Sequence, residues 1–64
     1  MTIYFLYIDV SGREYRNMTK VFTFVDEKQC RIIFEVLDNF LHDLYLHELI
    51  VNYSIRIEEG EIDD

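Results

Sequence analysis

The chain has 64 residues, of which half are hydrophobic and 16% are aromatic, and it contains no proline and only two glycines. This composition excludes a disordered or low-complexity chain, and the length allows a single domain, residues 1–64. Thirteen Asp and Glu residues against six Lys and Arg residues give a formal net charge of -7. This charge argues against a nucleic-acid-binding protein, which needs cations to displace phosphate counterions.

The charge is unevenly distributed along the chain. Residues 1–31 contain four acidic and five basic side chains, a balance of +1, whereas residues 32–64 contain nine acidic side chains against Arg56 alone, a balance of -8. An acidic surface of this size attracts basic partners from a distance and speeds their encounter. The alternative is a solvated surface that keeps a small protein soluble.

The cysteine content and the hydropathy bear on the location of the protein. A single cysteine, Cys30, cannot form an internal disulfide framework, and no charged-then-apolar leader precedes the first strand-like run. The longest uninterrupted apolar run, residues 3–8, is far below the roughly 18 residues that a membrane span needs. We therefore predict a soluble cytoplasmic protein without membrane contact.

The first predicted element is a strand over Thr2–Val10, which is rich in β-branched and aromatic residues. Gly12 can take the positive φ of a tight hairpin, so we expect a second extended run, residues 14–25, to fold back on the first. Within it, residues 21–25 (VFTFV) are predicted to belong to the sheet core. Its polar residues mark a solvent edge or a bulge: Arg16, Asn17 and Lys20.

A helix is predicted to begin after Asp26, whose carboxylate can cap the free amides of the first turn, with Glu27 adding negative charge there. From Gln29 to about His47, apolar side chains recur at intervals of three and four and form one continuous face. This predicted core face consists of Ile33, Val36, Leu37, Phe40, Leu41 and Leu44. The opposite, wet face consists of Lys28, Arg31, Glu35, Asp38, Asn39 and His42.

A third strand is predicted over residues 50–57, where apolar and polar side chains alternate. Its apolar positions are Val51, Tyr53, Ile55 and Ile57. The tail, residues 58–64, carries so much charge that we expect it to fray. The predicted fold class is therefore α+β, with the order β-β-α-β and one helix packed on one face of a three-stranded sheet.

Apolar side chains exceed what one helix can cover on one face of a sheet. The first strand is apolar on both sides, and the helix carries further apolar residues off its predicted core face: Ile32, Phe34, Tyr45 and Leu46. A contiguous apolar patch beyond a few hundred Å² usually marks an interface, and a chain below about 70 residues often gains stability by oligomerisation. We predict a homodimer. The alternative is a longer second strand that curls over part of the first.

No pattern of catalytic or metal-ligating residues stands out. His42 and His47 are five residues apart on the helix, so they point about 140° apart and cannot hold one metal ion together. Cys30 lacks a neighbouring base, and Gly12 and Gly60 stand alone instead of forming a phosphate-binding loop. We predict that the protein is not an enzyme, that it uses no cofactor or metal, and that it binds another protein through apolar side chains beside carboxylates.

Three segments carry a resemblance to a known family: residues 12–15 (GREY), residues 34–39 (FEVLDN), and residues 48–50 (ELI) leading to residues 55–57 (IRI). In this order they resemble segments of the small uracil-DNA glycosylase inhibitors of Bacillus podophages. The resemblance implies a phage-encoded homodimer whose paired helices form an apolar recess flanked by acids. It further implies a DNA mimic that occupies the DNA-binding groove of the host glycosylase and captures its protruding, DNA-wedging side chain.

By this resemblance, Phe34 lines the recess and Glu35 hydrogen-bonds enzyme groups that normally hold phosphate. The family has a tyrosine near the position of Asp38, for which Tyr45 is a spatial substitute. The expected partner-binding residues are Phe34, Glu35, Asp38, Leu41, His42 and Tyr45. Without the resemblance, dimer packing explains Phe34 and a solvated helix face explains Glu35. Two other functions stay open: an anti-CRISPR-type inhibitor of another nucleic-acid-binding protein, and a plain dimeric interaction module.

Overall fold

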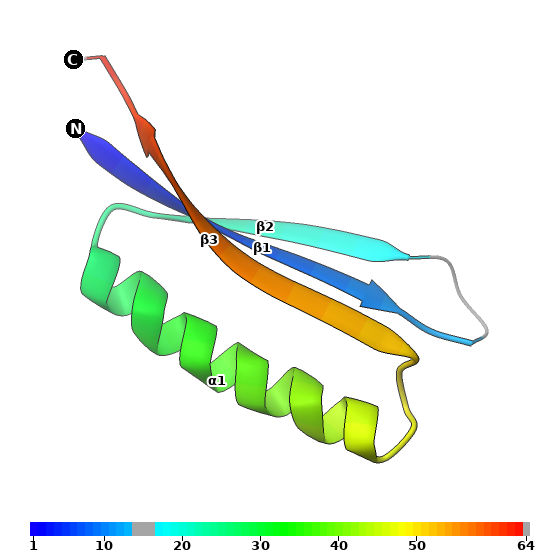
Figure 1. Cartoon of the computed structure of the whole chain (residues 1–64). Coiled ribbons are helices and arrows are strands. Elements are labelled where there is room, and N and C mark those ends of the chain that lie inside the picture. Colours follow the sequence, from blue (N-terminus) through cyan, green and yellow to red (C-terminus); the bar gives the residue numbers. More distant parts are fainter. Residues whose placement is uncertain (14–16, 64) are drawn as a thin grey trace.

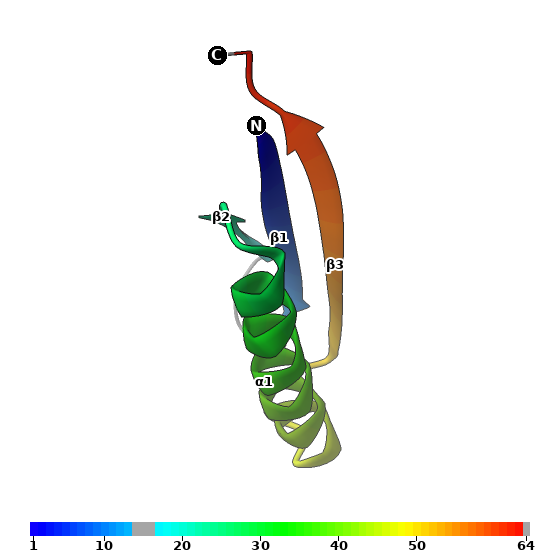
Figure 2. The same ribbon diagram turned by 90° about the vertical axis from the view of Figure 1, so that its left-hand side faces the viewer.

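The computed structural model describes residues 1–13 and 17–63 and consists of one sheet and one helix (Figure 1). Its elements are β1 (Thr2–Ser11), β2 (Met18–Phe24), α1 (Glu27–Leu46) and β3 (Asn52–Glu61). The strands form an antiparallel sheet in the order β2-β1-β3, and α1 runs along one face of it (Figure 2). The predicted α+β class and the β-β-α-β order are confirmed.

The strand β1 occupies the centre of the sheet because its side chains are apolar on both faces. Leu6 and Ile8 face α1 and are buried, and Ile3, on the opposite face, is only 8% exposed. A strand that is apolar on both sides loses least to solvent when it has a neighbour along each edge. The apolar side chains on both faces of the first strand, noted in the sequence, thus explain why β1 lies at the centre of the sheet.

The strand β3 pairs with β1 along its whole length, from Thr2 opposite Glu61 to Ser11 opposite Asn52. The prediction that the chain frays from residue 58 onward is therefore wrong for residues 58–61; Asp64 lies outside the described residues. The charged side chains project to the two sides of the strand, so they do not prevent its backbone from completing the ladder that β1 offers.

The strand β2 is an edge strand, which corrects the prediction that residues 21–25 belong to the sheet core. Val21 and Phe22 are 43% and 38% exposed, and Val25 is 66% exposed. The periodicity of this segment is that of a strand, but α1 packs mainly against β3 and β1, so the side chains of β2 are left open to solvent.

The connection between β1 and β2 differs from the predicted tight hairpin. Gly12 does not have a positive φ, and the strands end at Ser11 and begin again at Met18, too far apart in sequence for a two-residue turn. Arg16 and the other residues of 14–16 lie outside the described residues. Lys20 is exposed on the edge strand, as expected.

The helix α1 begins where the sequence predicts. Asp26 is the N-cap, and its carboxylate accepts a hydrogen bond from the Lys28 N–H at 2.9 Å. One turn further, the side chains of Glu27 and Arg31 form an ion pair at 3.0 Å. The Asp26 carboxylate thus satisfies one free amide of the first turn, and the Glu27 carboxylate places negative charge near the positive end of the helix dipole.

The helix ends in a Schellman motif that is built on a glutamate. The N–H of Glu48 donates to the Tyr45 carbonyl at 3.1 Å, and the N–H of Leu49 donates to the Leu44 carbonyl at 2.9 Å. Glu48 has a φ of 61°, in the left-handed region that usually holds glycine at this position. A side chain in this conformation costs about 1 kcal/mol.

The core lies between α1 and the strands β1 and β3. Its centre is formed by Ile8, Leu41 and Ile50, and Leu6 and Cys30 are fully buried as well. Leu37 and Leu44 pack against this centre, as predicted. The centre is small, because a single helix covers only part of one sheet face.

The predicted core face of the helix is partly wrong. Ile33, Val36 and Phe40 are 37%, 57% and 57% exposed. Cys30 takes their place, so the buried stripe runs through Cys30, Leu37, Leu41 and Leu44. Apolar residues cover more than half of the helix circumference, and the 3.6-residue period is compatible with either of two overlapping stripes.

Candidate functional site

The two sides of the buried stripe on α1 carry different surfaces. The first, which we call the β3 flank, lies beside β3 and carries Phe34, Glu35, Asp38, His42 and Tyr45. The second, which we call the apolar flank, lies on the side of β2 and consists of Ile32, Ile33, Val36 and Phe40, all exposed. Five of the six predicted site residues thus share one flank, because their spacings of three and four return to the same side of the helix.

A hollow of about 360 Å³ separates the β3 flank from β3. It is lined by Phe34 and Glu35 of α1 and by Ile55 and Ile57 of β3, with Arg31 and Arg56 at its rim. Phe34 is half-buried and Glu35 is exposed. The structure therefore brings the apolar side chain and the carboxylate that the resemblance singles out to one depression of the surface.

The two arginines at the rim are held by carboxylates. Arg31 pairs with Glu27 at 3.0 Å, and Arg56 pairs with Glu58 at 3.2 Å and with Asp9 at 3.8 Å. The Arg56 guanidinium also lies 4.4 Å from the centre of the Tyr7 ring, on the sheet face away from α1.

On the helix side of the hollow, Arg31, Glu27 and Glu35 give a net charge of -1. The guanidinium of Arg56 and its partners Asp9 and Glu58 lie on the sheet face away from α1. Among residues 1–13 and 17–63, no hydrogen bond or ion pair engages the Glu35 carboxylate. Its acceptor oxygens are therefore free to meet donors from a partner.

Aromatic residues and His42 form the other end of the β3 flank. His42 Nδ1 and the Tyr53 hydroxyl lie 3.2 Å apart, and the rings of Tyr45 and Tyr53 meet edge to face with their centres 6.2 Å apart. These contacts join the last turns of α1 to the start of β3. His42 and Tyr45 are thus fixed in place, with His42 still exposed at the surface.

The remaining two predicted site residues differ in exposure. Asp38 is half-buried, one turn after Phe34 on the β3 flank. Leu41 is 6% exposed and packs with Ile8 and Ile50, so its side chain belongs to the core of the chain and does not reach a partner surface. Leu41 was predicted both on the core face and at the partner site, because sequence periodicity indicates the side of the helix on which a residue lies but not how deeply it is buried.

The hollow also contains residues that the site prediction omitted. Ile55 and Ile57 form its wall, and Tyr53 holds His42. The signal that could have found them is the alternation of residues 50–57, which correctly placed all three on one side of the third strand. The alternation does not show, however, that this side of the strand lies next to the β3 flank of the helix.

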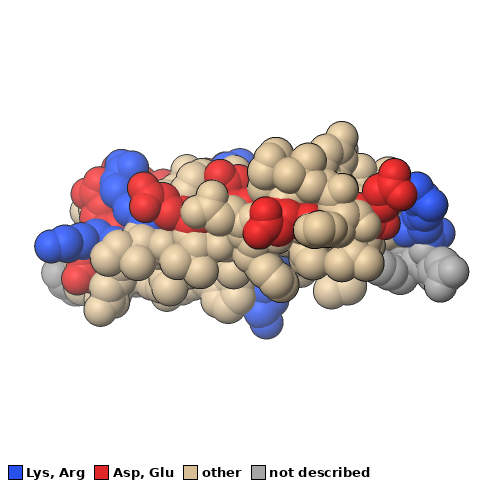
Figure 3. All heavy atoms as spheres, turned by 90° about the horizontal axis from the view of Figure 1, so that it is seen from below, with Lys and Arg blue, Asp and Glu red and all other residues tan. Residues whose placement is uncertain are grey.

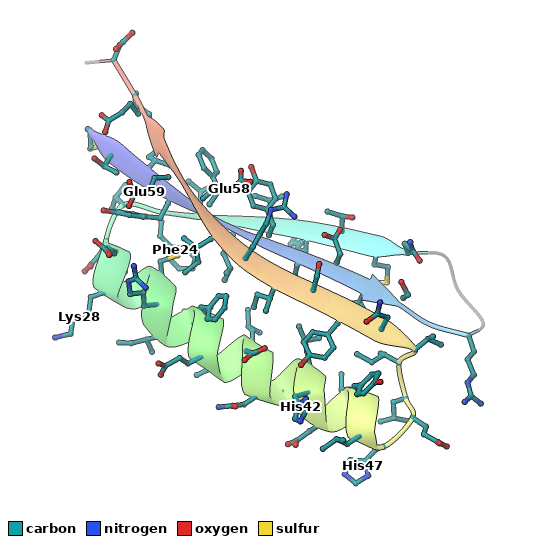
Figure 4. The ribbon with its side chains drawn as sticks, in the orientation of Figure 1. Phe24, Lys28, His42, His47, Glu58 and Glu59 are labelled. Carbon is teal, nitrogen blue, oxygen red and sulfur yellow. The ribbon has the colours of Figure 1, made fainter. Side chains whose placement is uncertain are left out.

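Acidic side chains are distributed over the helix side of the molecule and at one end of β3. Figure 3, viewed from the helix side, shows carboxylates spaced along the surface with uncharged residues between them. Glu58 and Glu59 lie on opposite sides of β3, in the half of the strand nearer the chain termini (Figure 4). This spacing produces an extended negative field instead of one concentrated cluster.

Cys30 and Tyr4, outside the hollow, have raised pKa values. Burial raises the pKa of the Cys30 thiol, which disfavours the nucleophilic thiolate. Burial also raises the pKa of the Tyr4 hydroxyl, as does the nearby carboxylate of Glu27, to which this hydroxyl donates at 3.3 Å. His42 and His47 do not converge on a common point (Figure 4).

Within residues 1–13 and 17–63, no three His, Cys, Asp or Glu side chains come together in a group that could hold a metal ion. In the same residues, no helix combines the length and the apolar character that crossing a membrane requires.

Comparison with protein-family models, with curated proteins and with solved structures gave no match. The resemblance to the glycosylase inhibitors therefore stays a prediction, and the chain is described by its α+β fold and by the hollow beside β3.

Proposed function

We propose that this protein is an acidic inhibitor that blocks the DNA-binding groove of a uracil-DNA glycosylase by DNA mimicry. The observation that supports the proposal is the position of Phe34 and Glu35 at one hollow between α1 and β3. Such an enzyme presents a cationic groove and an apolar side chain that wedges into DNA. The hollow offers an apolar recess for the wedge and a carboxylate beside it.

The apolar recess is formed by Phe34, Ile55 and Ile57. An inserted apolar side chain would leave water and contact apolar atoms on three sides, which contributes about 25 cal/mol per Å² of buried surface. The volume of the hollow, about 360 Å³, exceeds that of any single side chain. This hollow lies within one chain, between α1 and β3, whereas the resemblance implies a recess between the paired helices of a dimer.

The carboxylates supply the mimicry of DNA. Glu35 at the hollow and Asp38 one turn later would accept hydrogen bonds from enzyme groups that normally hold phosphate oxygens. The charge of -8 on residues 32–64 would draw the chain toward the cationic groove and orient it. The inhibitor needs no cofactor, metal or catalytic residue, because it acts by occupying the groove in the cytoplasm of the bacterial host.

Paired substitutions at the hollow test the proposal. Phe34→Ala and Glu35→Gln should each weaken binding to the glycosylase by at least about tenfold, the change typical of central interface residues. Asp43→Asn is the matched control for Glu35→Gln, since it also removes one exposed helical carboxylate but lies away from the hollow. Circular dichroism of each variant checks that the fold is kept. Equal affinities of all three variants and the natural chain would contradict the proposed site.

A further inference from the structure

The apolar flank and the strand β2 form a second exposed surface, which the proposed inhibition does not use. Part of the flank lines a hollow of about 290 Å³ together with Phe24 and Gln29. Phe22, on the same sheet face as Phe24, is 38% exposed. Figure 1 shows that α1 and β2 diverge from the segment that connects them. Met18 of β2 and Val36 and Phe40 of α1 are each more than half exposed.

The backbone of β2 has unpaired groups along its outer edge. Met1 and Ile62 exchange both backbone hydrogen bonds, at 3.1 and 2.9 Å, which sets the phase of the ladder between β1 and β3. Because both registers are unbroken, the even-numbered residues of β1 and β2 bond to each other. The N–H and C=O groups of Thr19, Val21 and Thr23 therefore point away from the sheet.

We propose that β2 pairs antiparallel with β2 of a second copy of this chain, around a twofold axis at Val21. The two three-stranded sheets then become one continuous sheet. An antiparallel strand pair has its twofold axis perpendicular to the sheet, so both helices lie on the same side. Their apolar flanks face each other across the axis, with Phe22 and Phe24 of both copies between them.

The sequence of β2 is self-complementary in this register. Thr19 lies opposite Thr23 of the second copy, and such Thr–Thr pairs are favourable across strands. Lys20 lies opposite Phe22 of the second copy. Within one chain the Lys20 ammonium already lies 5.7 Å from the centre of the Phe22 ring, so the same cation–π contact can form with either ring.

Charge selects β2 over the other edge strand and a second copy over a basic partner. Charged side chains on an edge strand oppose strand addition, and β3 carries Arg56, Glu58, Glu59 and Glu61, against Lys20 alone in β2. The residues of the apolar flank and of the helix-facing side of β2 include no carboxylate. Most carboxylates of residues 32–64 therefore lie elsewhere on the molecule, and Asp43, three residues after Phe40, lies at the end of the apolar flank.

Disulfide cross-linking tests the proposed register. Val21→Cys should form a covalent dimer under mild oxidation, because directly opposite residues in a hydrogen-bonded pair have Cα atoms about 5.5 Å apart, within the range that a disulfide spans. Thr19→Cys alone should stay uncross-linked, because its two copies would lie about 13 Å apart along the strands. A mixture of Thr19→Cys and Thr23→Cys should cross-link. The natural Cys30 is fully buried and does not interfere.

Solution mass provides the second measurement. Light scattering should show a dimer for the unmodified chain and for Leu49→Glu, a control at an exposed apolar residue outside the surface. Val36→Glu, which places a charge on the apolar flank, should give a monomer with an unchanged helix signal. A monomeric unmodified chain, an unlinked Val21→Cys, a self-linking Thr19→Cys or a dimeric Val36→Glu would each overturn the proposal. None of these results involves the glycosylase, so they are independent of the proposed inhibition.

Discussion

The ring of Phe5 lies directly over Gly60 on the neighbouring strand, on the sheet face away from α1. A Cβ atom at position 60 would lie 2.8 Å from Phe5 Cε2, closer than real side chains approach each other. Phe5 and Tyr7 also meet with their ring centres 6.3 Å apart, so the displaced ring would disturb a second contact. The glycine thus allows an aromatic side chain to cover the backbone of β3 near its end.

We expect Gly60→Ala to lower the free energy of unfolding by about 1 kcal/mol, because the ring of Phe5 must move from its packed position. The cost should largely disappear when Phe5 is replaced by Ala, since the added methyl group then has room. Urea denaturation of the two single variants and the double variant measures this coupling. An equal cost of Gly60→Ala in both backgrounds would show that the contact with Phe5 is not its cause.

We expect Glu48→Gly to raise the free energy of unfolding by about 1 kcal/mol. Glycine adopts a φ of 61° without the steric cost that glutamate has, and the change removes a negative charge from the negative end of the helix dipole. Glu48→Ala is the matched control, because it removes the charge but keeps the Cβ atom. In thermal unfolding, Glu48→Gly should have a higher melting temperature than Glu48→Ala. The reverse order would exclude backbone strain at this position.

Stability should decrease at alkaline pH as Cys30 ionises. Burial raises the pKa of this thiol above its ordinary value of 9.0, so the unfolded chain loses the thiol proton first. The contribution of the thiol is fully present below pH 9.0 and is lost as the pH rises through the folded-state pKa.

Denaturation curves across this pH range should therefore fall less steeply for Cys30→Ala than for the natural chain. Tyr4, whose pKa is also raised, contributes in the same direction from its ordinary value of 10.0, so Tyr4→Phe serves as the second reference. Parallel pH profiles for the natural chain and Cys30→Ala would show that the thiol has the same pKa in the folded and unfolded chains, which contradicts the prediction.

Association with the glycosylase should become slower as ionic strength rises. The long-range attraction between the acidic half of the chain and a cationic groove is screened over about 10 Å at 0.1 M salt. The apolar contacts at the hollow are not screened, so the dissociation rate should change much less. Stopped-flow or surface-plasmon measurements separate the two rates. A salt-independent association rate would exclude electrostatic steering by residues 32–64.

Local signals predicted the elements well. Asp26 followed by Glu27 located the start of α1, and the alternation of Tyr53, Ile55 and Ile57 located the side of β3 that faces the helix. Each of these signals depends on neighbours a few residues away. Local hydrogen bonds and side-chain periodicity determine them, so a single sequence contains the necessary information.

Long-range arrangement could not be predicted in the same way. Val21 and Phe22 look like core residues, but their exposure depends on which strand is central and on where the helix lies. Likewise, the apolar residues of α1 fit two stripes, and only packing against the sheet shows that Cys30 is buried and Phe40 is not. The same limit applies to the site, where Ile55 and Ile57 join Phe34 only through tertiary contact.

A uracil-excision assay tests the proposed function most directly. A stoichiometric excess of this protein, added to uracil-DNA glycosylase before uracil-containing DNA, should abolish base release, and added DNA should compete with the protein for the enzyme. Phe34→Ala at the same concentration should leave measurable activity. Full excision in the presence of excess natural protein would contradict the account.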